Sequence, residues 1–476
     1  MAHGRASAHA CVRSFQRRCN RSLFTHERQQ HAGSRAASIH PGANGAPPYR
    51  PSSVLDDWVQ REARPISLRQ LTFFGRTLTE ARLLSSANYV RTELPTRIAH
   101  RLRDMQTLPY VVVTNHHISH VYELYYRAFE RLRRVPEIRT VDDNDRYCKV
   151  IKETLREHLT VIPRLAMGVL EIQGLMKPEE TDKFMTTLLR SRISRRVIAE
   201  QHLALTETFH SPWYFPDATK LDNEHVDFVG EVFLRCSASE VVQRCAATIR
   251  DIVREAYGPA APVPEIRLEG HLDATFPYIL SHLEYIVGEL LRNSIQAVIE
   301  RRRPRGVASP PPPIEVLICE TNQHVIIRIS DQGGGVPREI LPHLWSFSKG
   351  PRRQMRLEAL NQVPQLAATL QELKALVSGT ARHGGGGKRH GGGHGGKHQH
   401  QPKKKLPESS LGSLSGRPPD LRLGIGLPMS RIYAEYWAGS LELHSLEGYG
   451  VDAFLQIPKL GNKNEQLTTR ASMDAV

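Results

Sequence analysis

Apolar residues recur three and four positions apart through most of the chain from Leu55 to about Glu255. This spacing places them on one face of an α-helix, with polar residues on the other face. Prolines punctuate the pattern, as they do where one helix ends and another begins. We therefore expect a four-helix bundle or a close relative of one, serving as an interaction domain. The helical stretches are residues 78–103, 120–134, 144–174, 179–210 and 238–257, and the prolines are Pro95, Pro109, Pro136, Pro163 and Pro178.

A different pattern begins at Glu265, where helical and alternating stretches follow one another. Alternation of apolar and polar residues is typical of half-buried strands, and short polar turns between such strands are typical of hairpins. The interleaving predicts a sandwich of helices on one mixed sheet, which makes the chain α+β as a whole. The expected strands are Ile266–Leu268, Ile314–Glu320, Val325–Ser330, Ser440–Ser445 and Val451–Pro458, and the expected helices are Pro277–Arg303 and Leu427–Tyr436.

An insert at residues 351–419 interrupts the second pattern. Leucines keep helical spacing over 353–378, where Pro364 is expected to break or kink the helix. Residues 379–420 are a Gly/His/Lys tract followed by Ser, Pro and Gly, a composition that cannot bury a core and predicts disorder. The tract is a flexible charged insertion, or its histidines bind metal ions loosely.

Composition allows two domains with separate cores, because the chain has 476 residues and about 40% of them are apolar. No run of 18 apolar residues is present, so the sequence predicts no transmembrane helix. The six cysteines are scattered and form no CxxC pair. This pattern argues against a zinc site or a disulfide framework and suits a reducing compartment.

The net charge of +15 is concentrated in two segments. Residues 1–50 carry eight arginines against one acidic residue, and residues 380–405 carry seven basic residues and no acidic one. Because the remainder is nearly neutral, we expect no nucleic-acid-binding surface on the folded part. The first segment has the composition of a mitochondrial transit peptide, and a basic tail without a targeting role is the alternative.

Candidate chemistry lies in the second half of the chain. Glu289 and Asn293 are four residues apart on the predicted helix and so share one face. Asp331 ends a predicted strand before three glycines, and the loops Gly424–Gly426 and Gly448–Gly450 follow. Together and in this order, these residues predict an ATP site. Taken singly, each has a structural alternative. The helix residues could lie on a solvated helix face, Asp331 could end a strand in a simple Asp-Gly turn, and Gly448–Gly450 could form a tight hairpin.

Each residue type suits a separate part of phosphoryl transfer. The Asn293 carboxamide can coordinate magnesium, and the Glu289 carboxylate can accept a proton from an attacking hydroxyl. An acceptor at Asp331 can bind the exocyclic amine of adenine. Gly424 and Gly426 precede a helix, whose first N–H groups can hold phosphates.

These motifs resemble the ATPase superfamily of gyrase, heat-shock chaperones, histidine kinases and mismatch-repair proteins (GHKL). More narrowly, the chain resembles the mitochondrial α-ketoacid dehydrogenase kinases over roughly residues 65–350 and 420–460. The resemblance is carried by the segments REHLTVIPRLAMGVLE (156–171), GELLRNSIQAVIE (288–300), ISDQGGGVP (329–337), GIGLPMSRIYAEYWAGSLEL (424–443) and SLEGYGVDAFL (445–455).

The resemblance implies a domain order and a set of site residues. A regulatory helical bundle at 55–257 would dock a lipoyl domain, a GHKL-type ATP-binding domain would span 262–350 and 420–460, the insert would be the ATP lid, and 461–476 a tail. Catalysis would use Glu289 as the base and His158 to modulate it. Asn293 would bind magnesium, and ATP would contact Asn293, Asp331, Gly333, Gly335, Ser348, Lys349, Gly424, Ile425, Gly426 and Leu427.

The function so implied is that of an ATP- and Mg²⁺-dependent protein serine kinase of the mitochondrial matrix. It would phosphorylate and inactivate the decarboxylase α subunit of an α-ketoacid dehydrogenase complex and would form a homodimer. The motifs mix features of the pyruvate and branched-chain types, so the substrate stays open. Arg422 and Val451 depart from the family's usual Gly and Thr, which supports an alternative, a regulatory module with little transfer activity. A true histidine kinase lacks support, because no receiver or sensor is recognisable.

Overall fold

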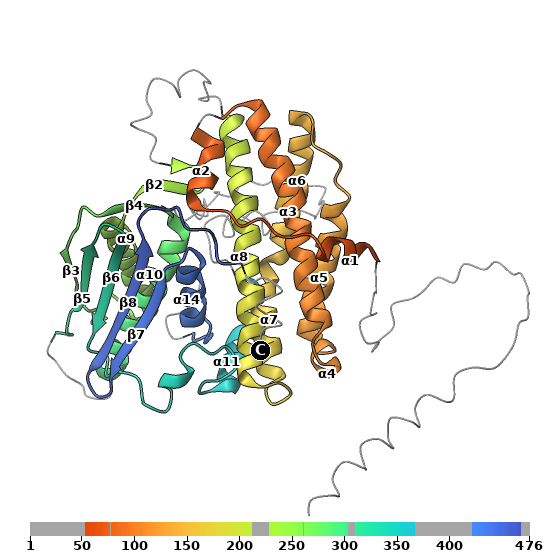
Figure 1. The fold of residues 1–476 in the computed structure, drawn as a ribbon. Coiled ribbons are helices and arrows are strands. Elements are labelled where there is room, and N and C mark those ends of the chain that lie inside the picture. Colours follow the sequence, from red (N-terminus) through yellow and green to blue (C-terminus); the bar gives the residue numbers. More distant parts are fainter. Residues whose placement is uncertain are drawn as a thin grey trace, which may run out of the picture. The chain divides into compact units, whose positions relative to one another are not determined.

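The computed structural model describes residues 53–76, 78–211, 228–259, 261–302, 310–366 and 421–467 (Figure 1). All of them belong to the unit Pro47–Val476. The predicted transit peptide at 1–50 and the Gly/His/Lys tract at 379–420 lie outside the described residues, and so does the second half of the helical stretch predicted at 353–378.

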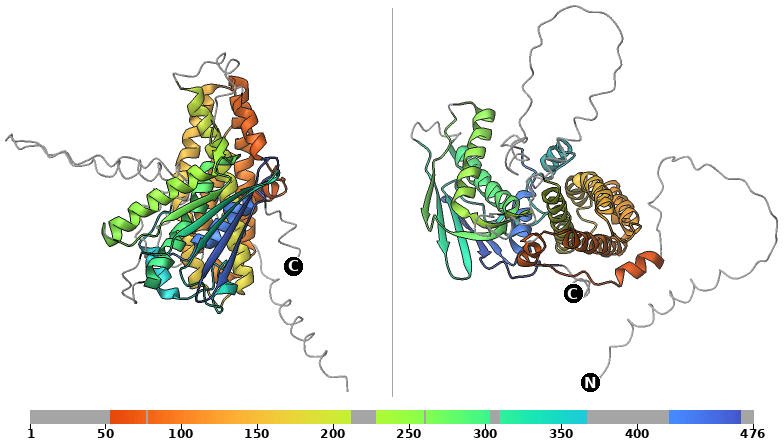
Figure 2. Two further views of the ribbon diagram at one scale, coloured as in Figure 1. Left: turned by 90° about the vertical axis from the view of Figure 1, so that its left-hand side faces the viewer. Right: turned by 90° about the horizontal axis from the view of Figure 1, so that it is seen from above.

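The first half of the described chain is helical, as predicted. Long helices α3, α5, α6, α7 and α8 run side by side (Figures 1 and 2) and bury aromatic side chains such as Tyr125 and Phe129. The bounds are α1 Ser53–Val59, α2 Leu68–Arg76, α3 Glu80–Gln106, α4 Tyr110–Val113, α5 His116–Arg133, α6 Val141–Glu157, α7 Val161–Glu171 and α8 Pro178–Phe209.

Two of the local expectations in this region were wrong. The stretch 144–174 is not one helix, because a single 3₁₀ turn at His158–Thr160 divides it into α6 and α7. Pro95 does not end a helix but lies within α3, which continues for 27 residues. Proline there removes one backbone hydrogen bond. Packing of α3 against both α5 and α8 compensates for that loss.

The second half forms the predicted mixed sheet with helices on one face. The strand order is β3-β5-β6-β8-β7, in which β3 and β5 are parallel and the other neighbours are antiparallel. Helices α10 and α14 pack against this sheet, and α11 lies in the insert. The bounds are β3 Ile266–Gly270, α10 Leu280–Arg302, β5 Ile314–Glu320, β6 His324–Asp331, a 3₁₀ turn Leu341–His343, α11 Arg353–Asn361, α14 Gly426–Tyr436, β7 Ser440–Leu446 and β8 Gly450–Pro458.

Sequence patterns did not predict a second, three-stranded sheet. It consists of β1 Phe228–Val229, β2 Val232–Ser237 and β4 Thr275–Ile279 in the order β1-β2-β4. The strands are short, and β4 contains Pro277, which an edge strand tolerates. Helix α9 (Ala238–Tyr257) follows β2 and packs beside α10.

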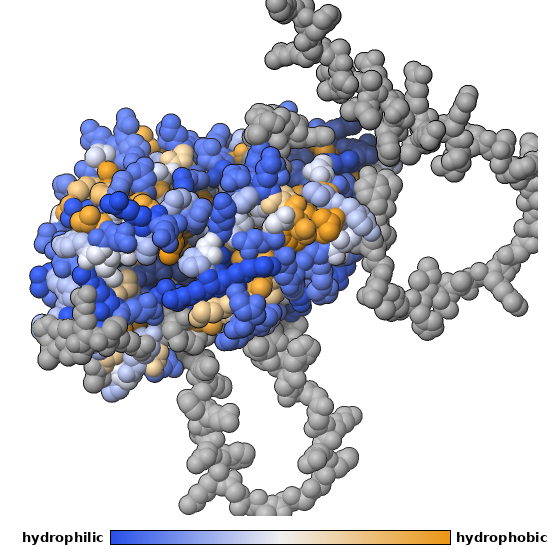
Figure 3. Space-filling model, turned by 90° about the horizontal axis from the view of Figure 1, so that it is seen from below, coloured by the Kyte–Doolittle hydropathy of each residue, from blue (hydrophilic) through white to orange (hydrophobic). Residues whose placement is uncertain are grey.

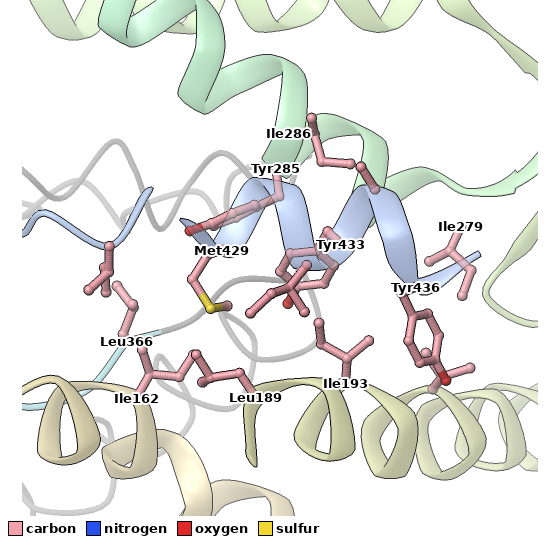
Figure 4. Close-up of a cluster of buried hydrophobic side chains, with 14 of the residues drawn as sticks. Ile162, Leu189, Ile193, Ile279, Tyr285, Ile286, Leu366, Met429, Tyr433 and Tyr436 are labelled. Carbon is pink, nitrogen blue, oxygen red and sulfur yellow. The ribbon is translucent and has the colours of Figure 1, made fainter. Parts of the chain in front are cut away.

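Helix α14 lies between the two halves of this unit. Met429, Tyr433 and Tyr436 point towards Leu189 and Ile193 of α8, and Tyr285 and Ile286 of α10 lie on the opposite side of α14 (Figure 4). All of these side chains are buried. The same helix therefore belongs to the core of both halves, and this position fixes where its N-terminus lies.

In the described part of the chain, no helix is long and apolar enough to span a membrane. The face shown in Figure 3 is largely hydrophilic, with apolar residues in a few small patches. Exposed large apolar residues occur on several elements, for example Tyr110 and Val111 on α4, Leu175 between α7 and α8, and Leu446 at the end of β7.

Candidate nucleotide site

One stripe of α10 meets the predicted nucleotide loops in turn. Glu289, Asn293, Ala297 and Arg301 are spaced by four residues and so lie on one face of the helix. Glu289 lies against Gly426, Ala297 lies against Gly333, and Arg301 reaches the turn of the β7–β8 hairpin. Asn293, between them, is exposed. The exposed Asn293 carboxamide thus lies between the buried Glu289 carboxylate on one side and, on the other, the residues of α10 that contact the Gly333 loop and the β7–β8 turn.

The Glu289 carboxylate lies at the N-terminus of α14. Its side chain is 5% exposed, and a Cβ added to Gly426 would lie 2.4 Å from Oε2. Only glycine at position 426 lets the acid approach this closely. Ile425 is the N-cap residue of α14 and makes no side-chain cap. Pro428 has no N–H and the Met429 N–H donates to the Ile425 carbonyl, so the N–H groups of Gly426 and Leu427 are those at this terminus that can bind an anion.

Asp331 is the last residue of β6, as predicted, and its carboxylate is held in one orientation. Oδ2 accepts a hydrogen bond from the Ser294 hydroxyl of α10 at 2.8 Å, and Oδ1 accepts one from the Gly333 N–H at 2.8 Å. Burial raises the pKa of Asp331, and the hydrogen bonds from Gly333, Ser294 and the Val451 N–H act in the opposite direction. A contact of this carboxylate with the adenine amine stays a prediction.

Arg301 joins the glycine loop after β6 to the β7–β8 turn. Its guanidinium donates to the carbonyls of Gln332, Tyr449 and Gly448 at 2.7–2.8 Å. The two loops also exchange main-chain hydrogen bonds, from Gly334 to Tyr449 and from Gly448 to Gly334. Gly335 has φ +74°, and a Cβ there would lie 2.3 Å from the Leu446 carbonyl oxygen. The glycines therefore allow the two loops to pack closely against each other, and they would also allow a ligand to approach the backbone.

Ser348 and Lys349 lie in a turn that helix α8 supports. The Asp182 carboxylate accepts hydrogen bonds from the N–H groups of Phe347 at 2.9 Å and Ser348 at 3.1 Å. The Lys349 N–H donates to the Ser346 hydroxyl at 2.9 Å. Ser348 itself is 4% exposed. A contact of these two residues with nucleotide stays a prediction.

His158 lies in the helical bundle. It is buried, its Nε2 is 3.5 Å from the Leu124 carbonyl oxygen, and its ring centroid is 5.3 Å from that of Tyr125. Burial, and next the charge of Arg195, hold the pKa of His158 well below its ordinary value. The histidine lines a cavity with Arg192, Arg195 and Arg196 of α8. All of these neighbours of His158 belong to the bundle, so modulation of Glu289 by His158 stays a prediction.

Arg422 and Val451, the two departures from the family pattern, both make contacts in the structure. Arg422 forms an ion pair with Glu300 of α10, with 2.5 Å between Nη2 and Oε2, so it joins the segment before Gly424 to α10. Val451 pairs with Asp331 across β6 and β8. Because its main-chain N–H supports the Asp331 carboxylate, the missing threonine hydroxyl is not needed for that support.

Several site residues were missed by sequence reasoning. Ala297 and Arg301 could have been found, because they continue the spacing of four that relates Glu289 to Asn293. Ser294 had no such signal. Asp182 lies on α8, more than 160 residues before the turn that it holds, and no local pattern reveals that contact.

The residues present fit a magnesium ion bound together with nucleotide. Magnesium prefers oxygen ligands, keeps several waters and is usually held by one or two protein groups plus phosphates. The exposed Asn293 carboxamide, one helical turn from the Glu289 carboxylate, offers such oxygen chemistry. Among the described residues, no cluster of three or more His, Cys, Asp or Glu side chains could hold a metal by itself.

We predict that Gly333→Ala weakens nucleotide binding by about 10-fold. The new Cβ would lie 2.4 Å from the Ala297 Cβ and would push the loop away from α10. Ala297→Gly in the same chain should restore part of the affinity, because it removes that methyl group. Titration with a fluorescent ATP analogue measures both effects, and equal weakening in the single and double variants would contradict this explanation.

Residues 65–233 match the family described as mitochondrial branched-chain alpha-ketoacid dehydrogenase kinase, and residues 279–395 match the histidine kinase-, DNA gyrase B- and HSP90-like ATPases. Pyruvate dehydrogenase (acetyl-transferring) kinase 2, mitochondrial, of Saccharomyces cerevisiae is 33% identical over 89% of this chain and 86% of its own length.

Two further relatives carry related names. The pyruvate dehydrogenase (acetyl-transferring) kinase, mitochondrial, of Arabidopsis thaliana is 29% identical over 88% of this chain and 97% of its own length. Isozyme 1 of the same kinase from Homo sapiens is 26% identical over 90% of this chain and 84% of its own length. The similarity therefore extends over both halves of the chain.

Proposed function

The chain belongs to the mitochondrial α-ketoacid dehydrogenase kinases, a family of protein serine kinases with a GHKL-type ATPase domain, and from this membership we propose its reaction. It transfers phosphate from ATP to a serine of the decarboxylase α subunit of an α-ketoacid dehydrogenase complex and thereby inactivates the complex. The observation that carries the proposal is the α10 stripe, which places Glu289 and Asn293 between the α14 N-terminus and the glycine loop after Asp331.

Each part of the site has a role in this proposal. The oriented Asp331 carboxylate accepts the adenine amine, and the loop with Gly333 and Gly335 borders the nucleotide. The phosphates lie at Gly424, Ile425, Gly426 and Leu427, where the N-terminus of α14 presents main-chain N–H groups. Ser348 and Lys349 border the same end of the nucleotide from the turn before the lid.

The chemical step needs charge compensation and a base. Asn293 would hold a magnesium ion together with the phosphates, and such an ion would supply positive charge to offset the charge on the transferred group. Glu289 accepts the proton of the attacking serine hydroxyl.

Partners and location follow from the same family. The relatives' names place those proteins in mitochondria and favour the pyruvate complex as substrate, whereas the match over 65–233 carries the branched-chain name. We propose the pyruvate complex as the first substrate to test and the matrix as the location. Docking of the helical bundle on a lipoyl domain, and a homodimer, belong to the proposal as well.

One observation favours a second function, a regulatory module with little transfer activity. The Arg422–Glu300 ion pair joins the two sides of the nucleotide site, and opening it would cost the chain an interaction. Both side chains are about half exposed, so this cost is small. We therefore keep the kinase as the first proposal.

A side-by-side phosphorylation assay tests the proposal. The purified chain, with radiolabelled ATP and magnesium, is offered the pyruvate and the branched-chain dehydrogenase complexes, with Asn293→Ala as control. Label on one α subunit, absent in the control, is the expected result and identifies the substrate. Binding of ATP without label on either subunit would support the regulatory module instead.

A further inference from the structure

Arg356 of α11 joins the two ends of the lid insert. Its Nη2 donates to the carbonyls of Phe347 at 2.8 Å and Gly424 at 3.3 Å, and its Nη1 donates to the carbonyl of Lys349 at 3.3 Å. Phe347 and Lys349 precede the insert, and Gly424 follows it. A single side chain therefore connects segments more than 70 residues apart in sequence, directly beside the predicted phosphate loop.

The glycine loop is shaped around this guanidinium. Gly424 has φ +70°, and a Cβ there would lie 2.3 Å from Nε of Arg356. Gly350 has φ +135°, and a Cβ there would lie 3.3 Å from Nη1. Side chains rarely adopt these backbone conformations, so both positions favour glycine. Since Gly424 lies two residues before the first residue of α14, the contact with Arg356 determines how the chain enters that helix.

Arg356 is a buried positive charge with incomplete compensation. It is 7% exposed, and the three groups to which it donates, described above, are main-chain carbonyls rather than carboxylates. Its Nε has no hydrogen-bond partner among the described residues. Burial lowers the pKa of Arg356, and the charge of Asp182 acts in the opposite direction. A partly compensated cation here adds to the positive potential of the α14 N-terminus, which favours an anion such as phosphate.

The helical bundle holds Arg356 and its acceptors in place from two sides. Asp182 of α8 accepts the N–H groups of Phe347 and Ser348, in the turn whose carbonyls Arg356 binds. Helix α11 itself packs on α7, where Leu360 is fully buried and the Leu366 N–H donates to the Leu159 carbonyl at 3.1 Å. The position of the guanidinium thus depends on two bundle helices.

We propose that Arg356 is a positioning residue for nucleotide binding and that the helical bundle completes the nucleotide site through it. Arg356 holds the Gly424–Gly426 loop in the conformation that presents the N-terminus of α14, and Asp182 and α7 hold Arg356. This inference rests on the proposed function in one respect, namely that the phosphates of ATP lie at this loop. It assigns no contact between Arg356 and the reacting atoms.

The experiment compares full-length variants in two measurements, the affinity for trinitrophenyl-ATP with magnesium and phosphate transfer at saturating ATP. Arg356→Met should lower the affinity about 10-fold while transfer at saturation stays within about twofold, because positioning affects binding and not the base. Arg356→Lys should recover part of the affinity, since it keeps the charge but not the three hydrogen bonds. Asp182→Ala should lower the affinity in the same direction.

Arg352→Met is the matched control, because Arg352 is an exposed arginine that directly precedes the same helix. It should bind the analogue like the unaltered chain. Unchanged affinity in Arg356→Met, or an equal loss in Arg352→Met, would overturn the positioning role while leaving the kinase proposal in place. Failure of the unaltered chain to bind the analogue would refute the nucleotide site itself and this inference with it.

Discussion

Glu289→Gln should lower phosphate transfer by about 10²-fold or more while leaving ATP binding intact, which is the usual size of a general-base contribution. Glutamine has the shape of glutamate and fits the space beside Gly426, but it cannot accept a proton from a serine hydroxyl. The substitution also removes a negative charge next to the α14 N-terminus, where phosphate is expected to bind. Affinity for ATP should therefore be kept or slightly raised.

Measuring both quantities in one preparation separates the chemical role from folding. Transfer is followed with radiolabelled ATP on the dehydrogenase complex, and binding with trinitrophenyl-ATP. Glu255→Gln is the matched control, because Glu255 is exposed on α9 and outside the site. Unchanged transfer in Glu289→Gln would remove the role of base. A parallel loss of transfer and binding would mean instead that the acid supports the structure of the loop.

The parts of the fold that the sequence predicted are those with a local signal. Strands β5 and β6 alternate apolar and polar residues, and the structure places them within a residue or two of the expected positions. The same holds for the β7–β8 hairpin and for α14. In each case the buried face is encoded within a few consecutive residues, so the periodicity alone is sufficient.

The parts that could not be predicted depend on contacts between distant residues. Strand β2 is a strand because it pairs with β4, some 40 residues later, and neither has a strong alternating pattern of its own. In the sequence, Asp182 and Arg356 are ordinary charged residues on helices. Their roles become visible only in the fold, where Asp182 contacts Ser348 before the insert and Arg356 contacts Gly424 after it. The site residues on α10 were predictable, but the residues that hold their neighbouring loops were not.

The contacts of Glu465, in the segment expected to be a tail, could not be predicted from the sequence either. They join the two halves of the unit. The Glu465 carboxylate pairs with Arg97 of α3 at 2.9 Å, accepts the Tyr436 hydroxyl of α14 and accepts the Ile66 N–H at 3.1 Å. The side chains of Arg97 and Glu465 are 2% and 0% exposed. Burial by itself would lower the pKa of Arg97, but the nearby carboxylate raises it above its ordinary value. The pair is therefore fully desolvated and mutually compensated.

Glu465→Ala should destabilise the fold by about 3 kcal/mol or more, because it leaves the Arg97 guanidinium buried with only part of its compensation. The measurement is the urea midpoint of the full chain at unchanged slope. Glu442→Ala, on an exposed face of β7, is the control and should change stability by less than about 0.5 kcal/mol.

A double variant distinguishes the loss of compensation from the loss of contact area. Arg97→Met with Glu465→Leu removes both charges and fills the space with apolar groups, a change that is often close to neutral for buried pairs. Glu93, which also pairs with Arg97, keeps its ion pair with Arg64 at 2.7 Å in that variant. The double variant should therefore be more stable than Glu465→Ala alone. If the two are equally unstable, the buried charge is not the cause, and the instability comes instead from the loss of the carboxylate that accepts the Ile66 N–H and the Tyr436 hydroxyl, which both variants lack.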